Sequence, residues 1–243
     1  MNLVVDIGNT RTKVAVFDEE TLVYHQVYDL TLKSDDIAEI ANHYPIGRAI
    51  VSQVGAALDY DKLFGCIPYK VLSSKLKLPI QNLYKTPTTL GADRLAASVG
   101  ATALFPNQNN LVIDMGTCIT LDFINCNNEY LGGVIMPGIS MKFKALHTFT
   151  DKLPLLSIDN VDSVGIVGIV GDDTWSSICS GVINGTILEL EGFVSRYVEQ
   201  FGKMNIIFTG GDAIYFEKRV KFPNFADSNL LLVGLNKILN TNE

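Results

Sequence analysis

The chain of 243 residues is long enough to bury a substantial core in one large domain or in two smaller ones. Hydrophobic residues make up 47% of it and charged residues 19%, which is typical of a globular protein. The formal net charge of -7 argues against a general nucleic-acid binder, because neutralising phosphates needs a concentrated basic surface, so we expect small molecules or other proteins as partners.

The chain opens with two apolar runs, residues 4–5 and 14–17, on either side of a polar turn. Their composition predicts a hairpin, and the Gly8-Asn9 pair permits the positive φ of a tight turn. Backbone N–H groups, hydroxyls and Lys13 would converge there on an anion, while Asp6 could hold a hydrated metal ion. An ordinary hairpin with solvated charges is the alternative for this turn taken alone.

The rest of the first half alternates strand-like and helix-like patterns, which predicts a mixed sheet with helices on its faces. The expected elements are strand 21–30, helix 34–44, strand 48–54, helix 58–64, strand 69–72, loop 73–90 and helix 95–104. Turn-forming residues at 105–110 then mark the clearest boundary in the chain.

The second half opens with another hairpin, at residues 111–124. The expected elements after it are strand 130–136, turn 137–140, helix 141–149, a glycine-rich segment 163–173, helix 175–202, strand 205–208, a sharp turn at 209–212 and a strand-to-helix segment at 230–239. Gly181, Gly185 and Gly192 would each weaken the long helix, which suggests that another backbone, at a helix seam or a subunit interface, packs closely there.

The two hairpins share one design, in which Asp-x-Gly stands between apolar runs: Asp6 with Gly8, and Asp114 with Gly116 and Thr117. Two such copies indicate two related halves. They resemble the phosphate-binding loops of the fold shared by actin, the sugar kinases and acetate kinase. That resemblance implies an α/β protein with two related RNase H-like (actin-like ATPase) domains, at 1–108 and 109–243. Each would have a mixed sheet flanked by helices, and the nucleotide would lie in a cleft between them.

Asp93 has two interpretations. A carboxylate in the first turn of a helix interacts favourably with the helix dipole and needs no further role. A positioned carboxylate can also accept the proton of a substrate hydroxyl as that oxygen attacks a γ-phosphoryl group. Arg94 beside it could bind a substrate carboxylate through two parallel hydrogen bonds.

Four motifs in this order and spacing resemble type III pantothenate kinase: Asp6-Ile7-Gly8-Asn9-Thr10, Gly91-Ala92-Asp93-Arg94, Asp114-Met115-Gly116-Thr117 and Thr209-Gly210-Gly211. The match covers nearly the whole chain. It implies ATP-dependent phosphorylation of pantothenate, the entry step to coenzyme A, with Asp93 as the proton acceptor. The expected ATP contacts are Asp6, Ile7, Gly8, Asn9, Thr10, Arg11, Thr12, Lys13 and Thr117. Pantothenate would be held by Tyr84, Gly91, Ala92, Asp93, Arg94 and Thr174.

The same resemblance implies a monovalent cation, K⁺ or NH₄⁺, at Asp114, and Mg²⁺ held through water near Asp6. Residues 209–211 would lie towards the nucleoside. The family is dimeric, which implies a homodimer with its active site at the interface. Cys118 departs from the family pattern, in which Ala is common, and the exchange should leave nucleotide binding intact.

The remaining signals concern location and alternatives. The residues before the first apolar run do not resemble a signal peptide, and the apolar stretch 164–170 is far shorter than the roughly 20 residues that span a bilayer. We therefore expect a cytoplasmic protein without membrane contact, whose four scattered cysteines are buried thiols. A non-catalytic relative with the same fold, or another small-molecule kinase of the superfamily, are the competing hypotheses.

Overall fold

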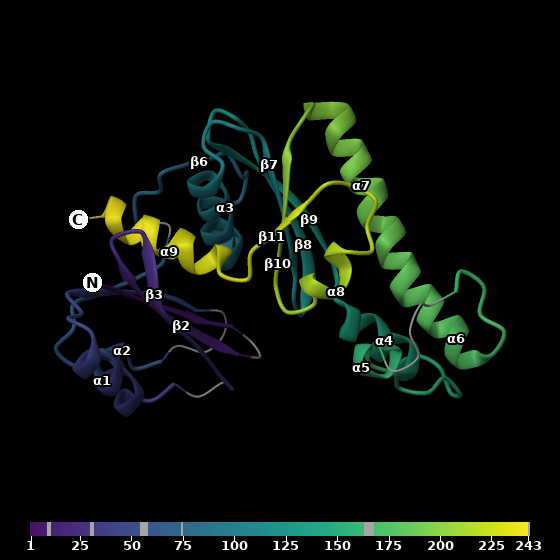
Figure 1. Ribbon diagram of the computed structural model, residues 1–243, viewed down its shortest axis with the longest axis horizontal. Helices are drawn as coiled ribbons and strands as arrows, with labels where there is room; N and C mark the ends of the chain where they lie inside the picture. The colour runs from purple at the N-terminus through teal and green to yellow at the C-terminus, as the bar shows by residue number, and fades with distance from the viewer. Residues whose placement is uncertain (9–10, 30–31, 54–57, 74, 163–167, 243) are drawn as a thin grey trace. The chain divides into compact units, whose positions relative to one another are not determined.

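The computed structural model describes residues 1–8, 11–29, 32–53, 58–73, 75–162 and 168–242 (Figure 1). The chain forms two compact units. Unit 1 contains Met1–Asn110, Asp122–Gly132 and Asn229–Glu243, and unit 2 contains Leu111–Leu121 and Gly133–Ser228. The predicted boundary at residue 108 thus lies close to one change of unit, whereas the units themselves interleave along the chain.

Unit 1 is built on a five-stranded mixed sheet with the strand order β3-β2-β1-β4-β5. Its strands are β1 (Asn2–Ile7), β2 (Thr12–Asp18), β3 (Thr21–Tyr28), β4 (Arg48–Gln53) and β5 (Tyr69–Val71). The first three run antiparallel, and β4 and β5 continue the sheet in parallel with β1. The predicted hairpin, mixed sheet and five strands of this unit are confirmed.

Helices cover both faces of this sheet. They are α1 (Ser34–His43), α2 (Tyr60–Phe64), α3 (Ala92–Leu104) and α9 (Leu230–Thr241). Leu3 and Val5 of β1 share a buried cluster with Ile37 and Ile40 of α1, and α9 contacts β1 from its other side. Because both faces are covered, β1 is an almost continuous apolar run, as expected for a central strand.

Two glycines allow α3 and α9 to pack with their backbones in close approach (Figure 1). A Cβ atom on Gly234 would lie 1.7 Å from the carbonyl oxygen of Ala96, and one on Gly100 would lie 2.1 Å from that of Leu230. These distances are far below van der Waals contact, so only glycine fits at either position. The C-terminal helix is thereby joined to the helix that carries Asp93.

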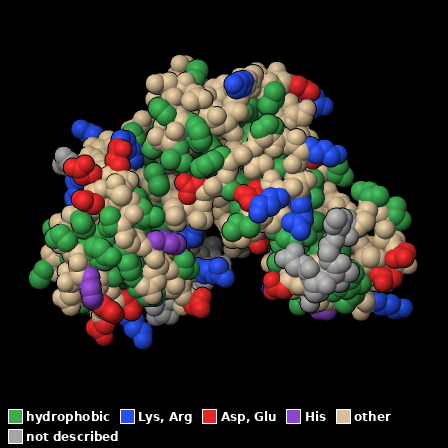
Figure 2. Space-filling model, viewed as in Figure 1, with side chains coloured by type: hydrophobic (Ala, Val, Ile, Leu, Met, Phe, Trp, Pro, Cys, Tyr) green, Lys and Arg blue, Asp and Glu red, His purple; other side chains and the backbone are tan. Residues whose placement is uncertain are grey.

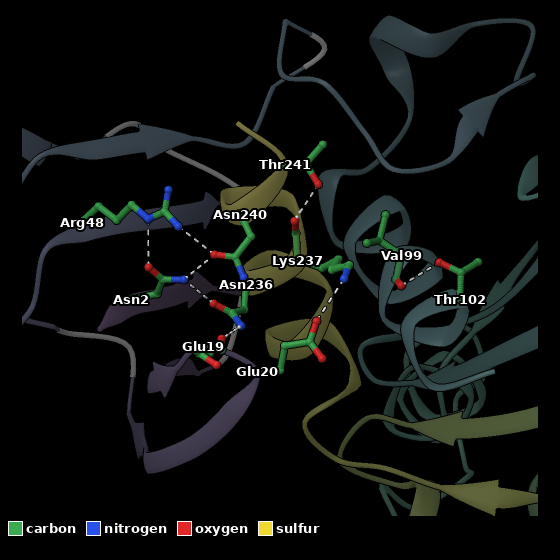
Figure 3. A network of polar contacts seen from close by, with 10 residues as sticks. All are labelled: Asn2, Glu19, Glu20, Arg48, Val99, Thr102, Asn236, Lys237, Asn240 and Thr241. Atoms are coloured by element: carbon green, nitrogen blue, oxygen red, sulfur yellow. Dashed lines mark hydrogen bonds and ion pairs between the residues drawn. The ribbon is translucent and has the colours of Figure 1, made fainter. Parts of the chain in front are cut away.

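A buried polar network fixes α9 to the start of β1 (Figure 3). The side-chain amide of Asn2 donates to the side-chain oxygens of Asn236 and Asn240, both at 2.7 Å, and Arg48 donates to Asn2 at 2.9 Å and to Asn240 at 2.8 Å. Asn236 in turn donates to the carbonyl of Glu19 at 2.7 Å. Because the buried side chains of Asn2 and Asn236 are hydrogen-bonded to each other and to partly buried neighbours, the network specifies the position of α9 rather than weakening the core.

The second sheet has the order β11-β10-β7-β8-β9-β6. Its strands are β6 (Gln81–Asn82), β7 (Asn110–Met115), β8 (Cys118–Ile124), β9 (Glu129–Pro137), β10 (Asn205–Thr209) and β11 (Phe225–Ala226). The predicted second hairpin corresponds to β7 and β8 and is confirmed. Unit 2 takes one end of β8 and most of β9, and unit 1 takes the rest of these two strands.

The helices of unit 2 are α4 (Ile139–Thr148), α5 (Ile158–Asp162), α6 (Thr174–Cys179), α7 (Gly185–Phe201) and α8 (Ala213–Glu217). The predicted long helix is confirmed as α6 and α7, which a π-helical turn, Ser180–Asn184, joins without a break. A Cβ atom on Gly181, Gly185 or Gly192 would meet no atom within 4 Å. The expectation that these glycines serve a close backbone seam within the described chain was therefore wrong.

Four further sequence-based expectations need correction. The segment 230–239 is helical throughout and contains no strand. The expected loop 73–90 contains the two-residue strand β6 and the 3₁₀ turn Pro87–Thr89, and α3 begins at Ala92 rather than at residue 95. Only Cys179 is a buried thiol, because Cys66 and Cys126 are exposed and Cys118 is half-buried.

The surface carries charges of both signs. On the face drawn in Figure 2, acidic and basic side chains are interspersed with hydrophobic ones. Within the described ranges, none of the helices is both long enough and apolar enough to span a bilayer.

Candidate active site

The first phosphate-loop candidate is the connection between β1 and β2. Asp6 lies at the end of β1, half-buried, with Lys13 of β2 opposite it and Ser52 of β4 on its other side. The N–H of Gly8 donates to the carbonyl of Arg11 at 3.0 Å and closes the turn. Asn9 and Thr10 are outside the described residues. The turn thus brings an exposed Arg11 and a half-buried Lys13 close in sequence to the Asp6 carboxylate.

Ile7 and Thr12 form the last pair of that hairpin, and both are buried. In a phosphate site, these two residues would therefore act through their backbone and the fixed strand ends rather than through exposed side chains. The connection is a candidate for anion binding because the paired strands hold its two ends together.

The second phosphate-loop candidate, in unit 2, is the turn between β7 and β8. Asp114 is half-buried near the end of β7, and Thr117 is exposed at the turn. The N–H of Gly116 donates to the carbonyl of Cys118 at 3.0 Å. Thr117 is thus exposed to solvent, whereas the Asp114 carboxylate is partly buried.

Two other segments of unit 2 pack directly on this turn. Gly210 has φ of 93°, and a Cβ atom there would lie 2.5 Å from Oδ1 of Asp114. A Cβ atom on Gly138 would lie 2.4 Å from the carbonyl oxygens of Gly116 and Thr117. The backbone N–H of Asp212 also donates to the carbonyl of Met115 at 3.0 Å. The backbone of the 209–212 turn therefore lies directly against the Asp114 carboxylate, which is an oxygen donor of the kind that hard cations prefer.

Asp93 lies in the first turn of α3, in unit 1, where it is half-buried. Its Oδ1 accepts the backbone N–H of Arg94 at 2.9 Å. The carboxylate bends back over Gly91, because a Cβ atom on that residue would lie only 2.4 Å from Oδ1. Gly91 thus leaves the space that the carboxylate occupies, while Ala92 begins the helix beside it.

Arg94 is buried and paired with Asp122 of β8. Its Nε donates to Oδ1 of Asp122 at 2.9 Å, its Nη2 lies 2.7 Å from the same oxygen, and the hydroxyl of Tyr130 donates to that oxygen at 2.6 Å. Burial alone lowers the pKa of Arg94, but the hydrogen bond and charge of Asp122 outweigh it and raise that pKa. Burial, together with the charge of Asp122, likewise raises the pKa of Tyr130, so the phenol stays a hydrogen-bond donor.

Tyr84 completes this group. The guanidinium carbon of Arg94 lies 5.9 Å from the centre of the Tyr84 ring, and the rings of Tyr84 and Tyr130 are 6.1 Å apart. Gly132, with φ of 107°, leaves room for the Tyr84 ring, which a Cβ atom there would approach to 3.1 Å. Five of the six predicted substrate residues therefore belong to one region of unit 1: Tyr84, Gly91, Ala92, Asp93 and Arg94.

Thr174 is exposed at the start of α6 in unit 2. Asp173 caps this helix by accepting the N–H of Ser176 at 2.6 Å, and that hydrogen bond lowers the pKa of Asp173. A cavity of about 540 Å³ lies beside it, lined by Leu146, Leu153, Ile178 and the 171–174 segment among others. Thr174, at the capped start of α6, is one of the residues that line this cavity.

Sequence reasoning missed Asp122, Tyr130 and Gly132. An available signal was Asp122 itself, because an acid within the apolar run of 119–124 needs a buried partner. No group of three or more His, Cys, Asp or Glu side chains within the described ranges is arranged to hold a metal ion. A cation bound mainly by phosphates and waters needs only one or two carboxylates from the protein, which Asp6 and Asp114 would supply.

A family model described as type III pantothenate kinase matches residues 2–196 of this chain. The type III pantothenate kinase of Cytophaga hutchinsonii is 40% identical over 242 residues, with both chains covered completely. That of Christiangramia forsetii is 43% identical over 250 residues, covering 100% of this chain and 99% of its own.

Solved structures confirm the fold class. The glucokinase of an Antarctic psychrotroph matches with a TM-score of 0.56 at 12% identity, covering 98% of each chain. Component A of (R)-2-hydroxyglutaryl-CoA dehydratase from Acidaminococcus fermentans matches with a TM-score of 0.55 at 12% identity, covering 100% of this chain and 99% of that one. The fold is therefore that of the actin-like ATPases and sugar kinases. With the family model covering most of its length and relatives at about 40% identity covering all of it, this chain belongs to the type III pantothenate kinase family.

Proposed function

We propose that this protein transfers the γ-phosphoryl group of ATP to the terminal hydroxyl of pantothenate, giving 4'-phosphopantothenate, the first step of coenzyme A biosynthesis. The observation that supports it most is family membership over the full chain, together with an intact Gly91-Ala92-Asp93-Arg94 segment at the start of α3. Phosphoryl transfer asks the protein mainly for positioning and charge neutralisation, and the half-buried Asp93 carboxylate is the candidate proton acceptor beside them.

Each predicted substrate residue has a role in the proposed reaction. As the pantothenate oxygen bonds to the γ-phosphorus, its proton passes to the carboxylate of Asp93, and the bond from phosphorus to the β–γ bridging oxygen breaks to release ADP. Arg94 binds the pantothenate carboxylate, and Tyr84, Gly91 and Ala92 form the wall of the substrate site. Thr174 of unit 2 contributes a hydroxyl to the same substrate.

The two Asp-x-Gly turns bind ATP in this proposal. Residues 6–13 surround the phosphates, with Lys13 and Arg11 supplying positive charge, and Thr117 contacts the nucleotide from the second turn. Mg²⁺ bound to ATP neutralises charge on the transferred group, and Asp6 is placed to hold it through water. Residues 209–211 lie towards the nucleoside.

Asp114 is the proposed ligand of a monovalent cation, K⁺ or NH₄⁺. Support comes from the half-buried Asp114 carboxylate, whose Oδ1 lies against the backbone at Gly210 and offers an oxygen ligand to a cation. Replacing K⁺ by Na⁺ in the assay should lower the rate of pantothenate phosphorylation several-fold, because Na⁺ is the smaller ion. The measurement is the initial rate at equal ionic strength, and equal rates in the two salts would remove Asp114 from this role.

The protein is proposed to act in the cytoplasm as a homodimer whose active site lies at the interface. Unit 2 exposes large apolar side chains that a second copy would cover, among them Phe149 at 85% and Val170 at 82% exposure. Sedimentation velocity should give a mass of two chains. A monomer at micromolar concentration that is fully active would contradict the shared site.

The direct test of the activity is ADP release by the purified protein with ATP, Mg²⁺ and K⁺. ADP release should depend on added pantothenate. Release that depends on another hydroxyl compound and not on pantothenate would indicate a different small-molecule kinase. ATP binding without turnover of any of these compounds would instead favour a non-catalytic relative.

A further inference from the structure

Asp122 and Tyr130 form a buried support for Arg94 that lies outside the four sequence motifs. Asp122 is 1% exposed and Tyr130 is completely buried. The Oδ1 atom of Asp122 contacts Nε and Nη2 of Arg94, and the Tyr130 hydroxyl donates a hydrogen bond to the same oxygen. All three residues belong to unit 1, and the second pair of strands, β8 and β9, supplies Asp122 and Tyr130. Strand β8 thus contacts Arg94, the residue that follows the proposed base Asp93, and β9 supports that contact through Tyr130.

The geometry of the pair fixes more than the position of a charge. A guanidinium is planar, so holding Nε and Nη2 on Asp122 also sets the direction of the Nη1 amino group. The Tyr84 ring lies against the same guanidinium, and the close approach of that ring depends on Gly132. Asp122 makes its contacts with Nε and Nη2, so Nη1 is the guanidinium nitrogen that this pair does not use, and the Tyr84 side chain also hydrogen-bonds Arg94.

Stability alone is a poor reason for such a pair. Burying a carboxylate and a guanidinium costs desolvation energy that their attraction offsets only in part, and an apolar pair of similar volume is often as stable. A preorganised guanidinium, in contrast, loses less side-chain entropy when it binds a carboxylate. The buried pair therefore has a use if Arg94 must present a fixed edge to a ligand.

We infer that Asp122, supported by the Tyr130 hydroxyl, is a positioning residue that orients Arg94 for the carboxylate of the substrate. The inference rests on the proposed function, since it takes pantothenate as the ligand whose carboxylate Arg94 meets. Asp122 touches neither substrate nor ATP and acts only through Arg94. Its loss therefore affects the recognition of one functional group of one substrate.

The test compares two substrates in Asp122→Asn, which keeps the shape of the side chain and removes its charge. With pantothenate, KM should rise about tenfold or more, because a charge-assisted pair that orients Arg94 is lost, while kcat stays within about threefold. With the alcohol analogue, in which CH₂OH replaces the carboxylate, KM should change by less than about twofold relative to wild type. The KM for ATP should also stay within about twofold of its wild-type value.

A matched control is Asn236→Leu, which removes another buried polar side chain of unit 1, far along the sequence in α9. Asn236→Leu should lower the melting temperature without changing the KM for pantothenate or for the alcohol analogue. If Asp122→Asn raises KM for both pantothenate and the alcohol, or for neither, the inference is overturned. If Asp122→Asn does not fold, Tyr130→Phe removes one contact to Asp122 and should give the same pattern with a smaller rise, about threefold.

A second readout separates this inference from the proposed function. In wild type, NMR should detect a distinct Nε–H signal of Arg94 that exchanges slowly with water, and Asp122→Asn should abolish this protection. If the wild-type Nε–H exchanges as fast as that of an exposed arginine, the support does not exist and the inference fails. If the signal is protected but wild type has no pantothenate-dependent activity, the proposed function fails, and with it the assignment of pantothenate as the ligand of Arg94.

Discussion

The position of the Asp93 carboxylate depends on the absence of a side chain at Gly91. Replacing Gly91 by Ala would put a Cβ atom 2.4 Å from Oδ1 of Asp93, so the carboxylate must turn away. Gly91 has φ of -58°, which alanine adopts easily, so the fold should be retained. We predict that kcat for pantothenate phosphorylation falls about 10- to 100-fold, because a displaced base no longer meets the hydroxyl.

The control for that variant is Gly47→Ala, where the added Cβ would lie 3.9 Å from the nearest atom, the carbonyl oxygen of Met1. Its kcat should equal that of wild type. Steady-state kinetics and thermal melting of both variants decide the question. A Gly91→Ala enzyme with wild-type kcat would show that the Asp93 carboxylate does not depend on this space.

Sequence reasoning at this scale identified residues near the proposed chemistry but not their partners. Asp93 and Arg94 are adjacent in a motif and could be found by reading along the chain. The pairing of Arg94 with Asp122 joins α3 to β8, 28 residues away, and depends on how the unit 1 end of β8 lies against α3. The only sequence signal for this pairing was the presence of Asp122 within the apolar run 119–124.

Helix packing in unit 1 depends on Gly234 and Gly100. Gly234→Ala would place a Cβ atom 1.7 Å from the carbonyl oxygen of Ala96, and backbone atoms cannot yield as a flexible side chain does. We predict a loss of about 1–3 kcal/mol or more in the free energy of unfolding, measured by urea denaturation. Gly192→Ala in α7, where the added atom meets nothing within 4 Å, should leave stability unchanged or raise it through helix propensity. Equal stability of the two variants would refute the close packing.

The turn before α8 should make stability depend on pH. Burial and the charge of Asp159 raise the pKa of Asp212, so the folded state holds that proton at a pH where the unfolded state has released it. Stability therefore falls as pH rises from the ordinary aspartate pKa through the raised one, and the cost persists at neutral pH.

Asp212→Asn removes that cost, and the wild-type side chain does not cap α8, so no cap is lost. After discounting for solvent screening, we predict a rise in melting temperature of about 1–3 °C at pH 7. The difference should vanish below the ordinary aspartate pKa. Asp18→Asn, at an exposed position of unit 1, controls for the change in net charge. A variant that melts with wild type at both pH values would contradict the account.

Elements with strong periodic patterns were predicted, and elements that exist through their neighbours were not. The hairpins and the long helix follow from apolar runs and three- and four-residue spacing. β6 and β11 contain two residues each and are strands only because they pair with β9 and β10. The apolar run at the start of α9 is buried in either conformation, so its burial did not distinguish strand from helix.

At the scale of the whole molecule, the two related halves of the sequence and the two compact units differ. The repeated hairpin predicts halves that meet near residue 108, whereas α9, from the end of the chain, belongs with unit 1. The physical reason is the apolar face of α3, where Gly100 allows the backbone of α9 to pack closely and bury that face. No local signal in residues 230–241 indicates which half of the chain this helix completes.

The measurement that tests the central claim most directly is detection of the phosphorylated product by ³¹P NMR. Wild type, incubated with ATP, Mg²⁺, K⁺ and pantothenate, should give a phosphomonoester signal that grows as ADP forms. Asp93→Asn should form it about 10²–10⁴ times more slowly while still binding ATP, because only the proton acceptor is lost. No phosphomonoester from wild type, or equal rates from the two proteins, would contradict the account.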